Sequence, residues 1–76
     1  MKFKTIDAYY QESDCGNYRI SKAKDHAVRD GVIFTLAKVN KTNPSGAKMI
    51  AQERCNNVAS ERAQAVKDLQ ELAGAQ

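Results

Sequence analysis

Residues 32–39 read Val-Ile-Phe-Thr-Leu-Ala-Lys-Val and decide the fold that the sequence predicts. β-Branched and aromatic residues dominate this stretch, and it is apolar on both sides for much of its length, which favours a buried strand at the centre of a sheet. Beyond residue 56 the apolar residues recur every three or four positions, which is helical spacing. This change of period predicts a small sheet with one helix laid across it.

Residues 18–24, Tyr-Arg-Ile-Ser-Lys-Ala-Lys, alternate well enough to predict a neighbouring strand. Successive side chains of a strand point to opposite faces. One side therefore carries Tyr18, Ile20 and Lys22, and the other side begins with Arg19. The side chains expected in the core of the sheet are Tyr18, Ile20, Phe34 and Leu36.

Residues 8–13, Ala-Tyr-Tyr-Gln-Glu-Ser, predict the first strand, in which Tyr9 and Tyr10 point to opposite sides so that one is buried and the other exposed. The next four residues combine an Asp with a Gly that tolerates positive φ, which predicts a tight reversal. Residues 25–31 are polar and end in Asp-Gly, a strong turn signal. We expect the tip of this second turn, around His26, to project into solvent.

Two segments before the helix are less regular. Residues 40–46, Asn-Lys-Thr-Asn-Pro-Ser-Gly, form a loop by composition, long enough to reach a partner. Residues 47–54 alternate weakly, and Ala, Gln and Glu are poor strand formers. Two alternatives therefore stay open for residues 47–54, a further strand or an early start of the helix.

The segment from Val58 onward consists mainly of helix formers, with Asn57 or Ser60 available to cap its start and Gly74 to end it. The apolar stripe expected to pack on the sheet is Ala59, Ala63, Val66, Leu69 and Ala73, widened by Leu72. We predict an α+β fold in which residues 1–76 form a single domain, with an antiparallel sheet of three or four strands and one C-terminal helix packed on one face.

Length and residue types exclude several function classes. A chain of 76 residues has room for one core and buries only about 60% of its unfolded surface, so an enzyme pocket would be costly. With one His and no triad-like grouping, the sequence predicts a non-catalytic protein without a cofactor. Cys15, Cys55 and His26 lack the paired spacing of a metal site, and we expect both thiols to be reduced and structural.

The distribution of charge is more telling than its net value of +3. Residues 1–54 hold ten of the twelve basic residues against six of the nine acidic ones, whereas residues 55–76 hold two against three. The predicted sheet is therefore basic and the helix slightly acidic. Such asymmetry indicates a polyanionic partner, because positive charge on one face attracts phosphate backbones and acidic protein surfaces alike.

Residues 13–20, Ser-Asp-Cys-Gly-Asn-Tyr-Arg-Ile, are followed by a strand that ends near Leu36 and by an Ala-rich C-terminal helix. In these features the chain resembles small uncharacterised phage and prophage proteins that carry an S-[DE]-C-G-x-[YF]-R-I hairpin. The order of its strands and helix is similar to that of the AP2-type DNA-binding domain, which lays a three-stranded sheet in the major groove. The first resemblance implies a phage or prophage origin, and the second implies contact with DNA.

No apolar run has the length of a signal peptide or approaches the roughly 20 residues of a membrane span. We therefore expect a soluble protein of the cytoplasm, without a membrane partner. If a phage encodes the chain, the compartment is the cytoplasm of the host cell.

Three functions follow from these observations. The slightly favoured one is binding of nucleic acid through a basic sheet face, with phosphate contacts and stacking from Tyr10, Arg19, Lys22, Lys24, Arg29 and Lys38. The second is a protein-binding inhibitor or adaptor that docks on an acidic surface of a host protein, such as a defence complex, through an edge strand or residues 40–46. The third is a homodimer formed through an apolar sheet face built from Ile33, Thr35, Ala37 and Val39.

Overall fold

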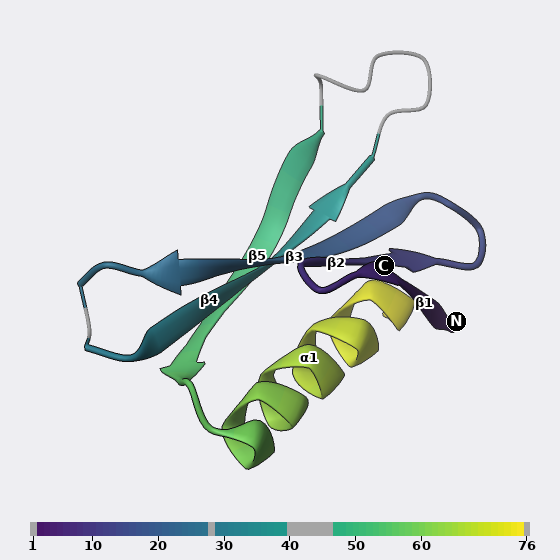
Figure 1. The fold of residues 1–76 in the computed structure, drawn as a ribbon. Coiled ribbons are helices and arrows are strands. Elements are labelled where there is room, and N and C mark those ends of the chain that lie inside the picture. Colours follow the sequence, from purple (N-terminus) through teal and green to yellow (C-terminus); the bar gives the residue numbers. More distant parts are fainter. Residues whose placement is uncertain (1, 28, 40–46, 76) are drawn as a thin grey trace.

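The computed structural model describes residues 2–27, 29–39 and 47–75. In these described residues five strands precede one helix (Figure 1), namely β1 Phe3–Asp7, β2 Tyr10–Ser13, β3 Tyr18–Asp25, β4 Gly31–Lys38, β5 Lys48–Asn56 and α1 Ala59–Gly74. Each strand pairs antiparallel with the next, so the sheet has the order β1-β2-β3-β4-β5. The predicted α+β fold with a C-terminal helix on one face is confirmed, and the sheet has more strands than expected.

The strand that the sequence did not predict is β1. Its residues are mostly polar, and only Phe3 packs, half-buried, against the core. The sequence of β1 shows no apolar period. Backbone hydrogen bonds pair it with β2, with Lys4 opposite Glu12. The AP2-type order has three strands before the helix. β1 and β5 bring the number in the described residues to five.

The strand predicted over residues 8–13 begins only at Tyr10, because Ala8 and Tyr9 form the turn between β1 and β2. Asp7 Oδ1 accepts the backbone N–H of Tyr9 at 2.7 Å and so stabilises this turn. The expectation that one of the two tyrosines is buried is wrong. Tyr9 is 61% exposed and Tyr10 is 43% exposed.

The two other described turns follow the sequence. Gly16 has a φ of 75° in the predicted reversal between β2 and β3. Ser13 Oγ accepts the backbone N–H of Tyr18 at 3.0 Å across this reversal. In the turn between β3 and β4, Asp30 takes a φ of 56° and His26 is exposed, as expected of a turn tip.

β4 lies inside the sheet, but the middle strand is β3, so the expectation that residues 32–39 form the central strand is corrected. Because β1 adds a strand at the edge opposite β5, the strand with two neighbours on each side is β3 and not β4. Of residues 47–54, those from Lys48 onward belong to β5 and not to the helix, because pairing along β4 outweighs weak strand propensity. The predicted loop at residues 40–46 lies outside the described residues.

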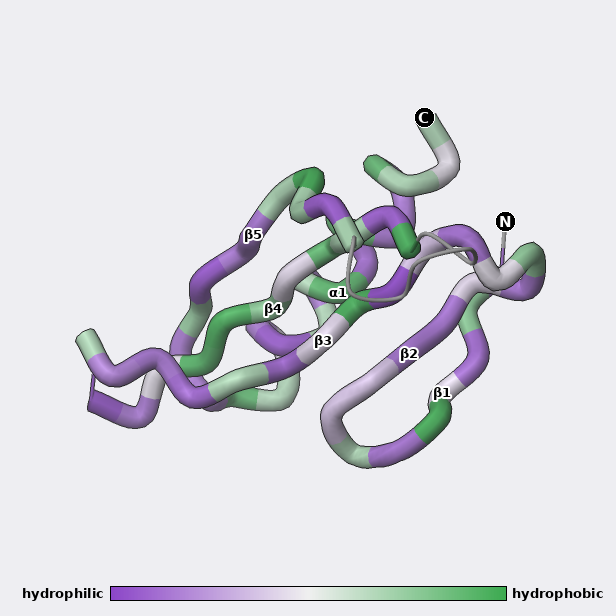
Figure 2. Tube along the Cα trace, turned by 90° about the horizontal axis from the view of Figure 1, so that it is seen from above, coloured by the Kyte–Doolittle hydropathy of each residue, from purple (hydrophilic) through white to green (hydrophobic). Residues whose placement is uncertain are grey.

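The core lies between α1 and the sheet face beneath it, which we call the covered face. Its buried side chains are Tyr18, Ile20, Val32, Phe34 and Leu36 from the sheet and Ala65, Leu69 and Ala73 from the helix. All four side chains expected in the sheet core are therefore confirmed. Figure 2 shows hydrophobic segments along β4, whereas β2 is mostly hydrophilic.

The start of α1 and its buried side differ from expectation. Val58 occupies the N-cap position without a side-chain cap, and Asn57 Oδ1 instead accepts a hydrogen bond from Arg62 Nη1. The helix ends at Gly74, as predicted.

The buried side of the helix departs from the predicted stripe in its first turns. Leu69 and Ala73 are buried and Val66 packs half-buried against the core, as expected. Ala59 and Ala63 are exposed, and Leu72 is 38% exposed. Alanines occur on several sides of α1, and one methyl group each carries too little apolar surface to fix the rotation from sequence. The buried row consists of Ala65, Leu69 and Ala73.

Candidate functional site

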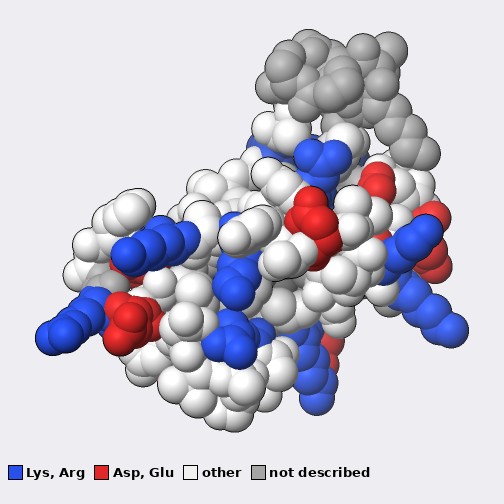
Figure 3. Space-filling model, in the orientation of Figure 1, with Lys and Arg blue, Asp and Glu red and all other residues white. Residues whose placement is uncertain are grey.

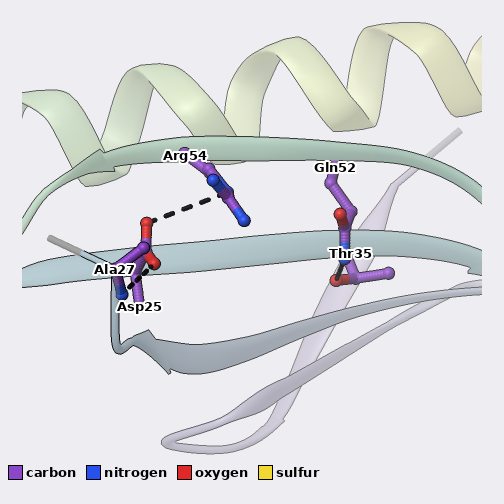
Figure 4. Close-up of polar contacts among 5 residues, drawn as sticks. All are labelled: Asp25, Ala27, Thr35, Gln52 and Arg54. Carbon is purple, nitrogen blue, oxygen red and sulfur yellow. Dashed lines mark hydrogen bonds and ion pairs between the residues drawn. The ribbon is translucent and has the colours of Figure 1, made fainter.

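The sheet face turned away from α1, which we call the open face, follows from the strand register. No helix of the described residues covers it. Directly opposed residues share a face, and the row across β2 to β5 is Tyr10, Ser21, Thr35 and Gln52. In this row Gln52 Nε2 donates to Thr35 Oγ1 at 3.3 Å, on the side away from the helix (Figure 4). These four side chains are half-buried or exposed, so a partner can reach them.

An aromatic ring and a cation meet on this face. The guanidinium carbon of Arg19 lies 5.6 Å from the centroid of the Tyr10 ring, within the range of a cation–π contact. Glu12 is directly opposite Arg19 in the register. Arg19 and Tyr10 are both exposed, so a planar cation and a ring lie together at the surface.

The open face carries more cations than the sequence indicated. By register it presents Lys4 beside Glu12 on β1, Arg19 on β3 and Arg54 opposite Ile33 on β5. Lys4 and Arg54 were missed because their orientation depends on β1 and β5, one not predicted and the other left undecided. The half-buried Glu12 lies between Lys4 and Arg19 and offsets part of their charge.

Asp25 is a second carboxylate on this face, but it is 2% exposed. Its Oδ1 accepts the backbone N–H of Ala27 at 3.0 Å, and its Oδ2 lies 3.8 Å from Arg54 Nε (Figure 4). The side chain of Arg54 is 62% exposed. Asp25 therefore organises the turn, while the guanidinium of Arg54 remains largely in solvent.

The structure brings together only two of the predicted contact residues, Tyr10 and Arg19. The strand register places three others on the helix side of the sheet, Lys22, Lys24 and Lys38. The prediction of one shared basic face is corrected, because residues separated by an odd number of positions in a strand project to opposite sides. Arg29 is exposed in the turn between β3 and β4.

The structure describes part of the surfaces predicted for a homodimer and for a protein-binding adaptor. Ile33, Thr35 and Ala37, from the predicted dimer face, lie on the open face and are half-buried. Val39 follows the end of β4. Residues 40–46, predicted to contact a protein, lie outside the described residues.

The two cysteines have different surroundings. Cys15 is exposed in the β2–β3 turn, whereas Cys55 is half-buried. The hydrogen bond with the Ser13 hydroxyl, followed by one with the backbone of Asn17, lowers the pKa of the Cys15 thiol. Burial, and then the charge of Glu61, raises the pKa of Cys55.

Residues 2–27, 29–39 and 47–75 contain no group of three or more His, Cys, Asp or Glu side chains that could hold a metal ion. In the same part of the chain, no helix has both the length and the apolar character needed to cross a membrane.

Comparisons with protein-family models, with curated proteins and with solved structures give no match for this chain. The resemblance to phage and prophage proteins therefore stays a prediction. Evidence on function comes from the geometry of the two sheet faces.

Proposed function

We propose that the protein is a non-catalytic module that binds single-stranded nucleic acid on the open face. The observation that carries this proposal is the contact between Arg19 and Tyr10 on a sheet face that no described helix covers. Unpaired bases stack on aromatic rings and on guanidinium planes, and stacking tolerates any base sequence. A base can extend the stack that the ring and the cation already form.

The other open-face cations are placed to contact a backbone. Lys4 and Arg54 lie on the two edge strands of the sheet, with Arg19 on the strand midway between them. A single strand that crosses β1 to β5 passes all three charges, and such phosphate contacts add affinity without sequence preference. Paired strands hold these side chains in fixed register, which reduces the ordering cost on binding.

Two neighbouring tyrosines provide a matched test of the proposal. Tyr9 and Tyr10 are both exposed, but Tyr9 borders a cavity with Ile20 and Val66 on the helix side, whereas Tyr10 lies on the open face. Binding of a fluorescein-labelled oligothymidine is measured by fluorescence anisotropy at low salt. Loss of one stacked base costs about 1 to 3 kcal/mol, so Tyr10→Ala should raise the Kd at least about fivefold.

Tyr9→Ala should leave this Kd within about twofold of the wild-type value, because its ring is on the other side of the sheet. Equal losses in the two variants would contradict stacking on the open face. Absence of oligothymidine binding by the wild-type protein at low salt would refute the proposed function itself.

A further inference from the structure

A groove runs along one flank of α1, on the side of the sheet opposite to the open face. The helix packs mainly on β5 and β4 and less on β3, and it reaches β2 through Gln70 Nε2, which donates to Gln11 Oε1 at 3.0 Å. The groove has a volume of about 460 Å³. Its lining includes Lys22, Phe34, Arg62, Ala63, Val66 and Lys67.

The groove is rimmed by cations from both walls. Lys22 rises from β3 and is half-buried, while Arg62 and Lys67 come from α1. Among the described residues, no carboxylate lines it, and Glu71 lies one helical turn beyond Lys67. Figure 3 shows basic side chains gathered near the centre of the view, over α1 and the neighbouring strands.

The other flank of α1, beside β5, has the opposite character. The acidic residues that line the hollow there are Glu53, Glu61 and Asp68, with Arg54 as the cation among the described lining residues. Lys22, Phe34 and Glu53 form one row across the sheet beneath the helix, so the change of sign occurs within three neighbouring strands. The helix thus separates a cationic flank from an acidic one.

The floor of the groove is apolar. Ala59 and Ala63 are exposed and small, and Val66 is half-buried beside Phe34, which is 5% exposed. A smaller cavity of about 50 Å³ adjoins the groove. Apolar side chains of a partner can therefore be buried between the two cationic walls.

We infer that this groove docks an acidic peptide segment of a partner protein, with carboxylates on the cations Lys22, Arg62 and Lys67 and an apolar side chain on the floor. The positive charge of the rim disfavours a basic segment, and the apolar floor favours burial of leucine-like side chains. Nucleic acid fits the groove less well, because the ring of Phe34 is buried and offers no face for stacking. The inference goes beyond the proposed function and uses the other side of the sheet.

The experiment uses a fluorescein-labelled peptide of glutamate and leucine and the full chain. In Arg62→Glu/Lys67→Glu two groove cations are reversed. In the matched control, Lys24→Glu/Lys48→Glu, the same charge change is made at two exposed lysines outside the groove lining. Thermal melts followed by circular dichroism check that both variants fold.

Fluorescence anisotropy should show at least a tenfold rise in Kd for the groove variant and no more than about a twofold rise for the control. The same peptide with glutamine in place of glutamate should bind at least tenfold more weakly. Amide NMR shifts on titration should concentrate at Ala63, Val66 and Lys67.

Several outcomes would overturn the inference. One is an equal loss of peptide affinity in the groove variant and the control variant. The others are amide shifts centred on the open face and displacement of the peptide from the groove by equimolar oligothymidine. Failure of oligothymidine to bind at all would refute only the proposed function, since the peptide assay does not depend on it.

Discussion

The covered and open faces of the sheet use the same strands for different purposes. On the covered face, buried Tyr18, Ile20 and Leu36 join the helix in the core, and the lysines of β3 lie beside them. On the open face, positions one residue away carry the Arg19–Tyr10 contact. Orientation within a strand therefore decides whether a side chain packs in the core or lies on the open face.

The largest expected effect comes from one substitution made on each face. Ile20 is 2% exposed in the core, whereas Ile33 is half-buried on the open face. Ile20→Ala should lower the free energy of unfolding by about 3 kcal/mol, because it removes buried methyl groups and leaves a cavity. Ile33→Ala should lower it by about 1 kcal/mol or less. Urea denaturation measures both.

The milder Ile20→Val and Ile33→Val pair keeps this comparison measurable if Ile20→Ala does not fold. The order of the two faces should be the same, with a cost of about 1 kcal/mol for Ile20→Val. Equal costs at the two positions would show that something covers the open face.

The second prediction concerns Asp25, the buried carboxylate of the open face. Asp25→Ala removes the acceptor of the Ala27 N–H and should cost about 1 to 2 kcal/mol of unfolding free energy. Arg54→Ala removes only an exposed partner at 3.8 Å and should cost about 0.5 kcal/mol or less. If urea denaturation gives equal losses of unfolding free energy for Asp25→Ala and Arg54→Ala, the ion pair and not the turn hydrogen bond stabilises the β3–β4 turn.

The smallest effect is expected at the thiols. Alkylation by iodoacetamide requires the thiolate, so its rate rises with pH through the thiol pKa. Because the pKa of Cys15 is lowered and that of Cys55 is raised, Cys15 should reach half its maximal rate at a lower pH. Ser13→Ala should move the Cys15 midpoint upward, since the Ser13 hydroxyl is the largest cause of the lowered pKa.

Mass spectrometry of the alkylated peptides distinguishes the two sites. Cys55 in the same Ser13→Ala sample is the internal control, and its midpoint should not move. An unchanged Cys15 midpoint would mean that the hydroxyl does not stabilise the thiolate.

Sequence period predicted the elements whose side chains are buried. Alternation at Tyr18 and Ile20 and at Phe34 and Leu36 located the covered face, because apolar burial imposes a period of two. β1 escaped prediction because hydrogen bonds between backbones, which leave no residue pattern, hold it to β2. The stripe of α1 was wrong only in its first turns, because Ala59 and Ala65 look equally suitable for burial until the sheet is present.

The candidate site was predicted only in part for a similar reason. Tyr10 and Arg19 were both predicted to contact nucleic acid, and they lie together on the open face. Lys22 was assigned to the same face, although it is two residues from Ile20 and therefore lies on the covered face. The cations Lys4 and Arg54 require the register of the two edge strands, which no local pattern gives.

The salt dependence of oligothymidine binding tests the central claim most directly. If Lys4, Arg19 and Arg54 each contact a phosphate, the logarithm of the association constant should fall with the logarithm of salt concentration with a slope of roughly −2. Arg19→Gln should make this slope less steep by about 0.7, whereas Lys24→Gln, the same charge change on the helix side, should not alter it. A wild-type slope near zero, or equal changes in the two variants, would contradict the assignment of nucleic-acid binding to the open face.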